Sequence, residues 1–110
     1  MSKTSLGEFE KLVMLAVMHL GLDAYGATII RALEERTGRT TSAGAVYVAL
    51  RRLEKKGLVT SRLGKPNPQR GGRPKRFFAV EREGVEALSR AQDDWAAMVR
   101  GLEETLAQSG

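Results

Sequence analysis

Apolar residues recur every three or four positions along the first third of the chain, the spacing that places them on one face of a helix. A first helix is expected over residues 9–20, and Ser5 and Glu8 ahead of it have the spacing of a capping box. The pattern is then interrupted, and Asp23 is placed to cap a second helix that ends near Gly38. This part of the chain therefore predicts two amphipathic helices.

A third helical pattern follows a run of hydroxyl-bearing residues and ends at Gly57. Its inward-facing positions are Val46, Leu50 and Leu53. The opposite surface carries Ala43, Tyr47, Arg51 and Lys55, with Gly44, Val48 and Arg52 to either side. The first turn holds the small or hydroxylated residues Thr41, Ser42, Ala43 and Gly44. Small side chains let the end of a helix enter the major groove of DNA, while hydroxyls and free amides bind phosphate. We expect Arg51 to reach a guanine edge or a phosphate, and Tyr47 to donate to a phosphate oxygen.

Helical spacing then gives way to two short β-prone segments, residues 58–63 and 76–80. Between them, residues 64–74 contain three prolines and three glycines, which exclude the interior of a helix or strand. Residues 82–108 return to helical spacing. The expected fold is mostly α with a small β-hairpin: three helices, a two-stranded hairpin with a long tip, and one long C-terminal helix.

Positive charge is concentrated in the middle of the chain. Residues 36–76 contain twelve basic residues and a single acidic one, Glu54, whereas the segments on either side have an excess of acids and the whole chain has a net charge of +5. If the charges lay only on one polar helix surface, or were spread evenly along the chain, they could simply face solvent without binding a partner. A concentrated basic block is instead typical of a protein that binds a polyanion.

The expected hairpin tip belongs to this basic block. Long loops without secondary structure are uncommon in small domains and usually have a function. We expect Arg70 and Arg73 to enter a minor groove, whose negative potential attracts arginine. Three further cations are expected to meet the phosphate backbone, namely Lys65, Lys75 and Arg76. A helix suited to the major groove followed by a basic hairpin predicts a winged helix-turn-helix over residues 1–80.

Several short motifs resemble the PadR family of bacterial transcriptional regulators over nearly the whole chain. They are LGEFE (6–10), YG (25–26), SAGAVY (42–47), LRRLE (50–54), KGLV (56–59), GGRPKRFF (71–78) and Gly84. The family pattern usually has tyrosines at the positions of Phe77 and Phe78 and threonine at Glu81. The resemblance implies a winged-helix dimer that represses transcription, often of its own or a neighbouring operon, and a member with a short C-terminal region.

The C-terminal helix carries a seam whose positions are spaced alternately three and four residues apart. These positions are Val85, Leu88, Gln92, Trp95, Val99, Leu102 and Leu106. Such a heptad seam is typical of a helix that pairs with a partner, and the polar Gln92 would help to fix the register. We therefore expect residues 81–110 to form a homodimerisation helix. The alternative is that this helix packs back on its own domain.

Trp95, the single tryptophan, lies in the middle of this seam. It is expected to anchor the dimer, as buried aromatic side chains do at many interfaces. Alternatively, it forms the wall of a pocket between subunits and stacks on a small planar apolar effector. Met14 and Met18 could line the same space, although methionines at helical spacing more often belong to a core.

The inventory of reactive side chains argues against an enzyme. The chain has no cysteine and one histidine, and no cluster with the spacing of metal ligands, so neither a metal nor another cofactor is expected. No apolar run approaches the length that spans a membrane. We expect a cytoplasmic protein.

The sequence thus predicts a repressor that binds double-stranded DNA as a homodimer, at an operator with inverted repeats. A winged-helix module for protein interaction, without DNA affinity, would leave the basic tip and the small-residue helix start unexplained. An RNA-binding protein would need exposed aromatic platforms, and this chain has only six aromatic residues.

Overall fold

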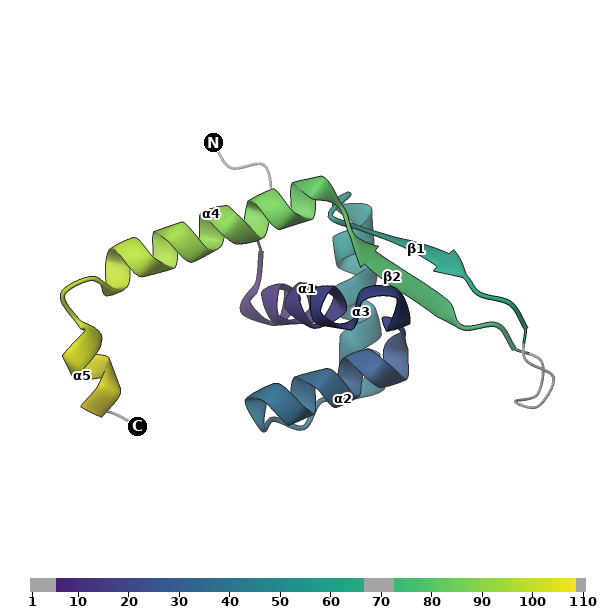
Figure 1. Cartoon of the computed structure of the whole chain (residues 1–110), viewed down its shortest axis with the longest axis horizontal. Coiled ribbons are helices and arrows are strands. Elements are labelled where there is room, and N and C mark those ends of the chain that lie inside the picture. Colours follow the sequence, from purple (N-terminus) through teal and green to yellow (C-terminus); the bar gives the residue numbers. More distant parts are fainter. Residues whose placement is uncertain (1–5, 67–72, 109–110) are drawn as a thin grey trace.

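A computed structural model describes residues 6–66 and 73–108, and the order of their elements matches the sequence prediction (Figure 1). The elements are α1 (Glu8–Leu20), the short 3₁₀ helix η1 (Gly21–Asp23), α2 (Gly26–Thr37), α3 (Ala43–Lys55), β1 (Val59–Leu63), β2 (Arg76–Val80), α4 (Arg82–Val99) and α5 (Glu103–Gln108). The first three helices cluster together, while the hairpin and α4 extend from them toward opposite ends of the molecule (Figure 1). The predicted class, mostly α with a small hairpin in a winged helix-turn-helix arrangement, is confirmed.

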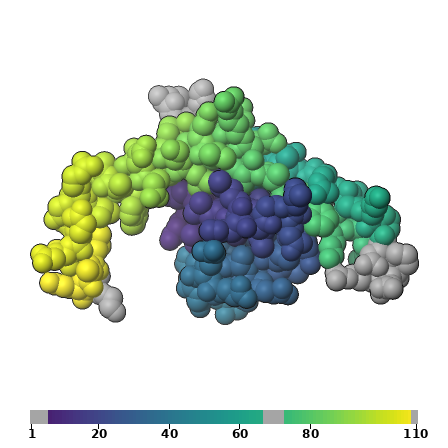
Figure 2. All heavy atoms as spheres, viewed as in Figure 1, coloured from purple at the N-terminus to yellow at the C-terminus, as the bar shows by residue number. Residues whose placement is uncertain are grey.

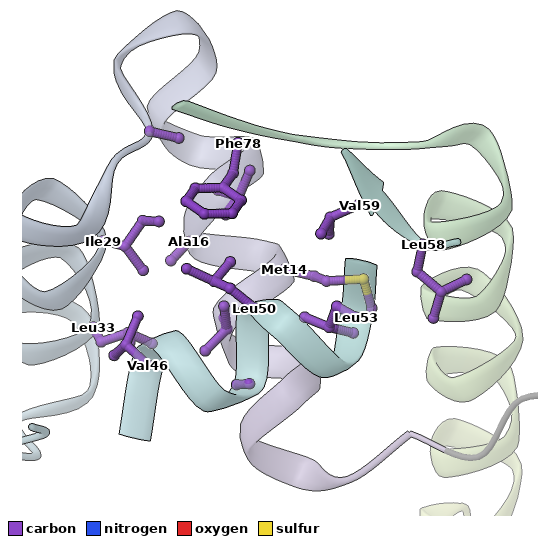
Figure 3. Packing of buried hydrophobic residues seen from close by; sticks show 14 residues of the cluster. Met14, Ala16, Ile29, Leu33, Val46, Leu50, Leu53, Leu58, Val59 and Phe78 are labelled. Atoms are coloured by element: carbon purple, nitrogen blue, oxygen red, sulfur yellow. The ribbon is translucent and has the colours of Figure 1, made fainter. Parts of the chain in front are cut away.

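The core is built where α1, α2, α3 and the base of the hairpin meet (Figure 3). The predicted inward positions of α3 are confirmed, since Val46, Leu50 and Leu53 are at most 1% exposed. They pack with Met14 of α1 and Phe78 of β2 in the same cluster. Fully burying side chains of this size contributes about 1.5–3 kcal/mol each. This burial holds α3 by one face and leaves its opposite face outward.

The helix starts differ from two of the three predicted caps. The N-cap of α1 is Gly7, whose amide donates to the Glu10 carboxylate at 2.9 Å. The predicted box, Ser5 to Glu8, is therefore two residues too early, and Ser5 lies outside the described residues. The side chain of Asp23 caps no helix, because the N-cap of α2 is Tyr25, whose amide donates to the Thr28 hydroxyl at 3.0 Å. In both cases a polar side chain three residues inside the helix satisfies the cap amide.

The cap of α3 is confirmed. The Ser42 hydroxyl accepts from the amide of Ala45 at 3.1 Å. At the other end, Gly57 follows the helix with a φ of +77°, a conformation that favours glycine. A defined start and end fix which residues of α3 face outward.

The hairpin is antiparallel, with Val59 opposite Val80 and Leu63 opposite Arg76. The second strand has the predicted bounds and the first begins one residue later than predicted. A backbone hydrogen bond of 2.8 Å from the Phe78 amide to the Ala24 carbonyl fastens the hairpin to the segment before α2. A Cβ at Gly84 would lie 2.5 Å from the Leu58 carbonyl oxygen, so glycine lets α4 start directly against the hairpin base.

The prediction of one continuous helix over residues 82–108 is wrong. Helix α4 ends at Val99, and Gly101 adopts a φ of +93°, which an α-helix cannot contain. The Gly101 amide donates to the Glu103 carboxylate at 2.8 Å, and α5 starts there in a new direction (Figure 1). The apolar spacing of three and four continues across this turn, which is why the sequence suggested a single helix. Leu102 and Leu106 are therefore not on the same helix as Val85 and Trp95.

Candidate nucleic-acid interface

The outward face of α3 is basic and has an open start. Ala43 and Gly44 in its first turn are exposed, and a Cβ built on Gly44 would meet no atom within 4 Å. Beyond them the predicted positions Tyr47, Arg51 and Lys55 are exposed, as expected from their helical spacing. Thr41 is half-buried and Ser42 exposed just before the helix. The first turn can thus approach another molecule closely, and the cations follow about two and three turns later.

Val48 and Arg52, expected to either side of this face, are also exposed. Val48 is 51% exposed, unusual for a large aliphatic side chain, and Arg52 is exposed beside it. A thymine methyl group is the kind of partner that an aliphatic side chain contacts in a major groove. Their exposure follows from the helical spacing that predicted it.

Tyr47 is held in place by the start of α2. A Cβ on Gly26 would lie 2.3 Å from the Tyr47 hydroxyl oxygen, so any larger residue at position 26 would displace the ring. The side chain remains 46% exposed. Gly26 therefore lets a tyrosine of α3 lie against α2 and keep part of its surface outward.

The cations of the hairpin fall into two groups. Lys65 and Arg73 are exposed near the ends of the described strands, whereas Arg70 lies outside the described residues. Lys75 is half-buried, with its ammonium 4.1 Å from the centre of the Tyr25 ring. Arg76 donates from Nη1 to the Ser61 hydroxyl at 3.0 Å. Lys65 and Arg73 thus extend outward, while Lys75 and Arg76 make contacts within the chain.

Lys56 is also engaged inside the protein. Its ammonium bonds both carboxylate oxygens of Glu10, at 3.0 and 3.2 Å, and Glu10 is only 8% exposed. Burial alone would raise the pKa of Glu10, but the hydrogen bonds from the Gly7 amide and from Lys56 outweigh it and lower that pKa below its usual value. This ion pair joins the start of α1 to the end of α3 and thereby supports the outward face of α3.

A second surface lies between α1 and α4. A groove of about 460 Å³ is lined by apolar residues of both helices, including Leu15, Met18, Val85, Leu88 and Trp95, together with the polar Gln92. Met18 is 46% and Trp95 68% exposed, so both are accessible from the groove. Met14 was expected at the same place, but it is fully buried in the core and does not line the groove. Instead it packs with residues of α3 and the hairpin base, next to Leu53 and Val59 (Figure 3).

The exposed apolar surface continues beyond this groove onto the end of the chain. Met98, which the sequence analysis did not single out, is 77% exposed, and Leu102 and Leu106 are about half exposed at 52% and 50%. Val99 is half-buried. Figure 2 shows the C-terminal segment standing away from the three-helix body, with a hollow between them. A soluble monomer rarely exposes so many large apolar side chains together, which marks an interaction surface.

Among residues 6–66 and 73–108, no three or more histidine, cysteine, aspartate or glutamate side chains are grouped so that they could hold a metal ion. No helix in those ranges is long and apolar enough to cross a membrane.

Comparison with known proteins gives one family. Residues 14–90 match the model of the transcriptional regulator PadR-like family. A PadR family transcriptional regulator from Eggerthella lenta is 27% identical, with a TM-score of 0.70 over 90% of this chain and 86% of that one. A PadR family transcription regulator from Clostridium difficile (22% identity, TM-score 0.70, 89% and 98% covered) and a PadR-like transcriptional regulator from Bacillus cereus (18%, 0.70, 89% and 90%) share the fold. No curated protein sequence gives a significant match.

Proposed function

This chain belongs to the PadR-like family of transcriptional regulators, which are DNA-binding proteins and not enzymes, and we propose that it is a repressor that occupies an inverted-repeat operator as a homodimer. The observation that carries the proposal is the outward face of α3, where an open, small-residue start lies ahead of exposed cations. A dimer that is bound to its operator within a promoter blocks the access of RNA polymerase. Residues 1–80 form the DNA-binding part, and residues 81–110 form the dimerisation part.

The first turn of α3 is the part that enters the major groove. Thr41 and Ser42 stand beside it with hydroxyls for phosphate, and Ala43 and Gly44 leave room for base edges. Farther along the same face, Arg51 reads a guanine edge or binds a phosphate. Tyr47 and Lys55 contact the backbone, and backbone contacts of this kind fix the orientation of the helix on the duplex.

The hairpin is the wing. Arg73 and Lys65, both exposed, contact the minor groove and the phosphates beside it, together with Arg70 of the tip. Lys75 and Arg76 contribute positive potential to the same region, while Lys75 also contacts Tyr25 and Arg76 also contacts Ser61.

The homodimer forms through the groove between α1 and α4. A two-fold axis lets each chain insert the exposed apolar side chains of its C-terminal end into the groove of the other, so that one kind of contact is made twice. Those side chains are Trp95, Met98, Val99, Leu102 and Leu106, and the groove offers Leu15, Met18, Val85 and Leu88, with Gln92 to fix the register. Because a symmetric dimer presents two recognition helices, its operator has two half-sites, about 34–36 Å or one helical turn apart.

Release from DNA occurs through the same interface. A small planar apolar effector stacks on Trp95 beside Met18, whose exposed faces line one groove. The compound lowers operator affinity only if it binds the spacing of recognition helices that does not fit DNA more tightly than the spacing that does.

Selection from a pool of random DNA duplexes tests the function directly. We expect the chain to enrich an inverted repeat, to protect two half-sites in a footprint, and to scatter light with about twice its 12.0 kDa mass. Arg51→Ala is expected to weaken binding by about 1–3 kcal/mol and to relax the preference at one position of each half-site. A single asymmetric half-site, or a monomer at micromolar concentration, contradicts the proposal.

Aromatic compounds test the effector. Quenching of Trp95 fluorescence is expected to accompany a loss of affinity for the selected operator. Quenching without that loss means that the pocket exists but does not regulate. If no compound quenches, Trp95 serves only as an anchor of the dimer.

A further inference from the structure

The basic block has one member whose charge opposes DNA binding. Glu54 is the single acidic residue among residues 36–76, and it lies in the last turn of α3, the helix that we assign to the major groove. It is exposed, so it is not needed to fill the core. A carboxylate repels nearby phosphates, so an acidic residue at this position weakens DNA binding unless it contributes to it in another way.

Glu54 is the end of a hydrogen-bonded relay to the hairpin. The Ser61 hydroxyl, on β1, donates to Oε2 of Glu54 at 2.7 Å. The same hydroxyl accepts from Nη1 of Arg76, the first residue of β2, at 3.0 Å. One side chain of α3 is therefore joined to both strands of the hairpin, on the side that carries Ser61 and Arg76.

The opposite face of the hairpin is held by aromatic rings. Side chains of neighbouring residues in a strand point to opposite faces of the sheet, so the Phe77 ring is on the face opposite to the Arg76 side chain. The rings of Phe77 and Tyr25 meet edge to face with centres 5.5 Å apart. Lys75 lies over the Tyr25 ring at 4.1 Å, and Arg62 lies over the Phe77 ring at 4.9 Å. The hairpin base is thus fixed to α3 on one face and to the start of α2 on the other.

We propose that Glu54 is a positioning residue for DNA binding: through Ser61 and Arg76 it sets the angle of the wing relative to the recognition helix. This inference rests on the proposed function. Lys65 lies four positions after Ser61, two of them beyond the end of β1, which is about 13 Å for extended chain at ~3.3 Å per residue. A rotation of about 15° at the base displaces a group at that distance by roughly 3 Å, which is the length of a hydrogen bond.

The sign of the effect separates this role from plain electrostatics. If charge alone mattered, replacing Glu54 by a neutral residue would strengthen DNA binding, because one repulsive charge is removed. If Glu54 positions the wing, the same replacement weakens binding. It also lowers the salt dependence, because contacts between the wing and phosphates are lost.

The experiment compares Glu54→Gln with Glu35→Gln on the duplex that the wild-type chain selects from a random pool. Each variant removes one exposed negative charge, and Glu35 lies on α2, away from the relay. In Glu54→Gln the neutral amide oxygen can still accept from Ser61, but it is a weaker acceptor than the carboxylate, so the relay is weakened. We expect Glu54→Gln to bind about fivefold more weakly, with a shallower salt dependence, and Glu35→Gln to bind as tightly as the wild type or more tightly. Melting temperature and dimer mass are expected to stay unchanged for both. Binding by Glu54→Gln that equals or exceeds that of the wild type overturns the proposal.

Two further variants keep the test decisive. Ser61→Ala breaks the relay without any change of charge, and it is expected to weaken DNA binding as Glu54→Gln does. If Glu54→Gln does not fold, the DNA affinity of Ser61→Ala tests the positioning role instead. Arg73→Ala is expected to cost less affinity in the Glu54→Gln background than in the wild type, since the wing is already displaced. Equal costs in both backgrounds overturn the positioning role. If the wild-type chain binds no duplex at all, the proposed function is wrong. If the wild-type chain binds and Glu54→Gln binds at least as tightly, only the positioning role is wrong.

Discussion

The three-helix body and the C-terminal arm (residues 93–108) carry similar helical patterns of apolar residues but bury them to very different degrees. In the body, Val13, Ile29 and Leu50 are at most 1% exposed. In the arm, Trp95 and Met98 are 68% and 77% exposed. The body is closed because three helices and the hairpin surround one core. The arm extends past the body, and on its apolar side only Trp95 shares a groove with α1 (Figures 1 and 2).

The two regions differ in what covers the apolar face of each helix, although their spacing is the same. A helical spacing of apolar residues says that one face of a helix is to be covered, and it does not say which molecule covers it. Helix α4 contains both cases: Gly84 and Ala87 are buried against the body, and Trp95, two to three turns later, is exposed. Substitutions in the two regions are therefore expected to fail in different ways, one by unfolding and the other by loss of association.

The largest effect is expected in the body. Leu50→Ala leaves a cavity in a fully packed site, since Leu50 is 1% exposed among residues of three helices and β2. We expect the free energy of unfolding to fall by about 2–5 kcal/mol. Chemical denaturation at two protein concentrations measures it. The loss is expected to be the same at both concentrations, because the defect lies within one chain; a loss that disappears at high concentration would contradict this account of the body.

The second effect is expected in the groove beside the arm. Leu15→Asp places an unpaired charge in the proposed interface and is expected to raise the dimer dissociation constant by at least about tenfold. Leu22→Asp is the matched control, because Leu22 is a leucine that is even more exposed, at 86% against 42%, and lies on η1 outside the groove. Light scattering over a dilution series reads both. Equal dissociation constants for the two variants contradict the assignment of the groove as the dimer interface.

Most of the body could be predicted from the sequence because its determinants are local. The inward face of α3 follows from spacing within one helix, and its cap follows from a serine three residues before the amide that it accepts from. The bounds of β2 follow from β-prone residues after a stretch rich in proline and glycine. Such signals act within a few residues, where a single chain is enough to judge them.

The remaining features depend on contacts between residues that are distant along the chain. The relay from Glu54 to Ser61 and Arg76 spans more than twenty residues, and the sequence alone marked Glu54 only as a lone acid in a basic block. The end of α4 depends on Gly101, where the apolar spacing continues but the backbone turns. Met14 differs from Met18 only in which side of α1 the rest of the fold covers.

A third, smaller effect is expected on α3, where the body itself presents an uncovered surface. Gly44→Ala adds a Cβ in open space to a helix, and it is expected to stabilise the fold by up to about 0.5–1 kcal/mol. Gly44→Leu is also expected to fold, but it is expected to lower DNA affinity at least about tenfold, because the first turn no longer fits the groove. Thermal melting and DNA titration check the two readouts. A Gly44→Leu variant that folds and binds DNA as the wild type does excludes this turn from the interface.

The smallest effect is expected from the ion pair between Glu10 and Lys56, which joins the start of α1 to the end of α3 inside the body. The pKa of Glu10 in the folded protein is lowered below its ordinary value of 4.5, because its hydrogen bonds with Gly7 and Lys56 outweigh the effect of burial. A carboxylate with a lowered folded pKa contributes stability that is fully present above pH 4.5 and is lost as the pH falls through the folded pKa.

We therefore expect the wild-type melting temperature to fall more steeply with acidification below pH 4.5 than that of Glu10→Gln, which has no proton to gain at this site. At pH 7 Glu10→Gln is expected to be the less stable of the two, since the ion pair between Glu10 and Lys56 is then lost, and the difference is expected to shrink as the pH falls. Glu8→Gln is the matched control, because Glu8 is an exposed neighbour whose 3.8 Å contact with Arg39 lies at the surface and is worth little. A difference between wild type and Glu10→Gln that stays constant from pH 7 to pH 3 would mean that the carboxylate acts through packing and not through its charge.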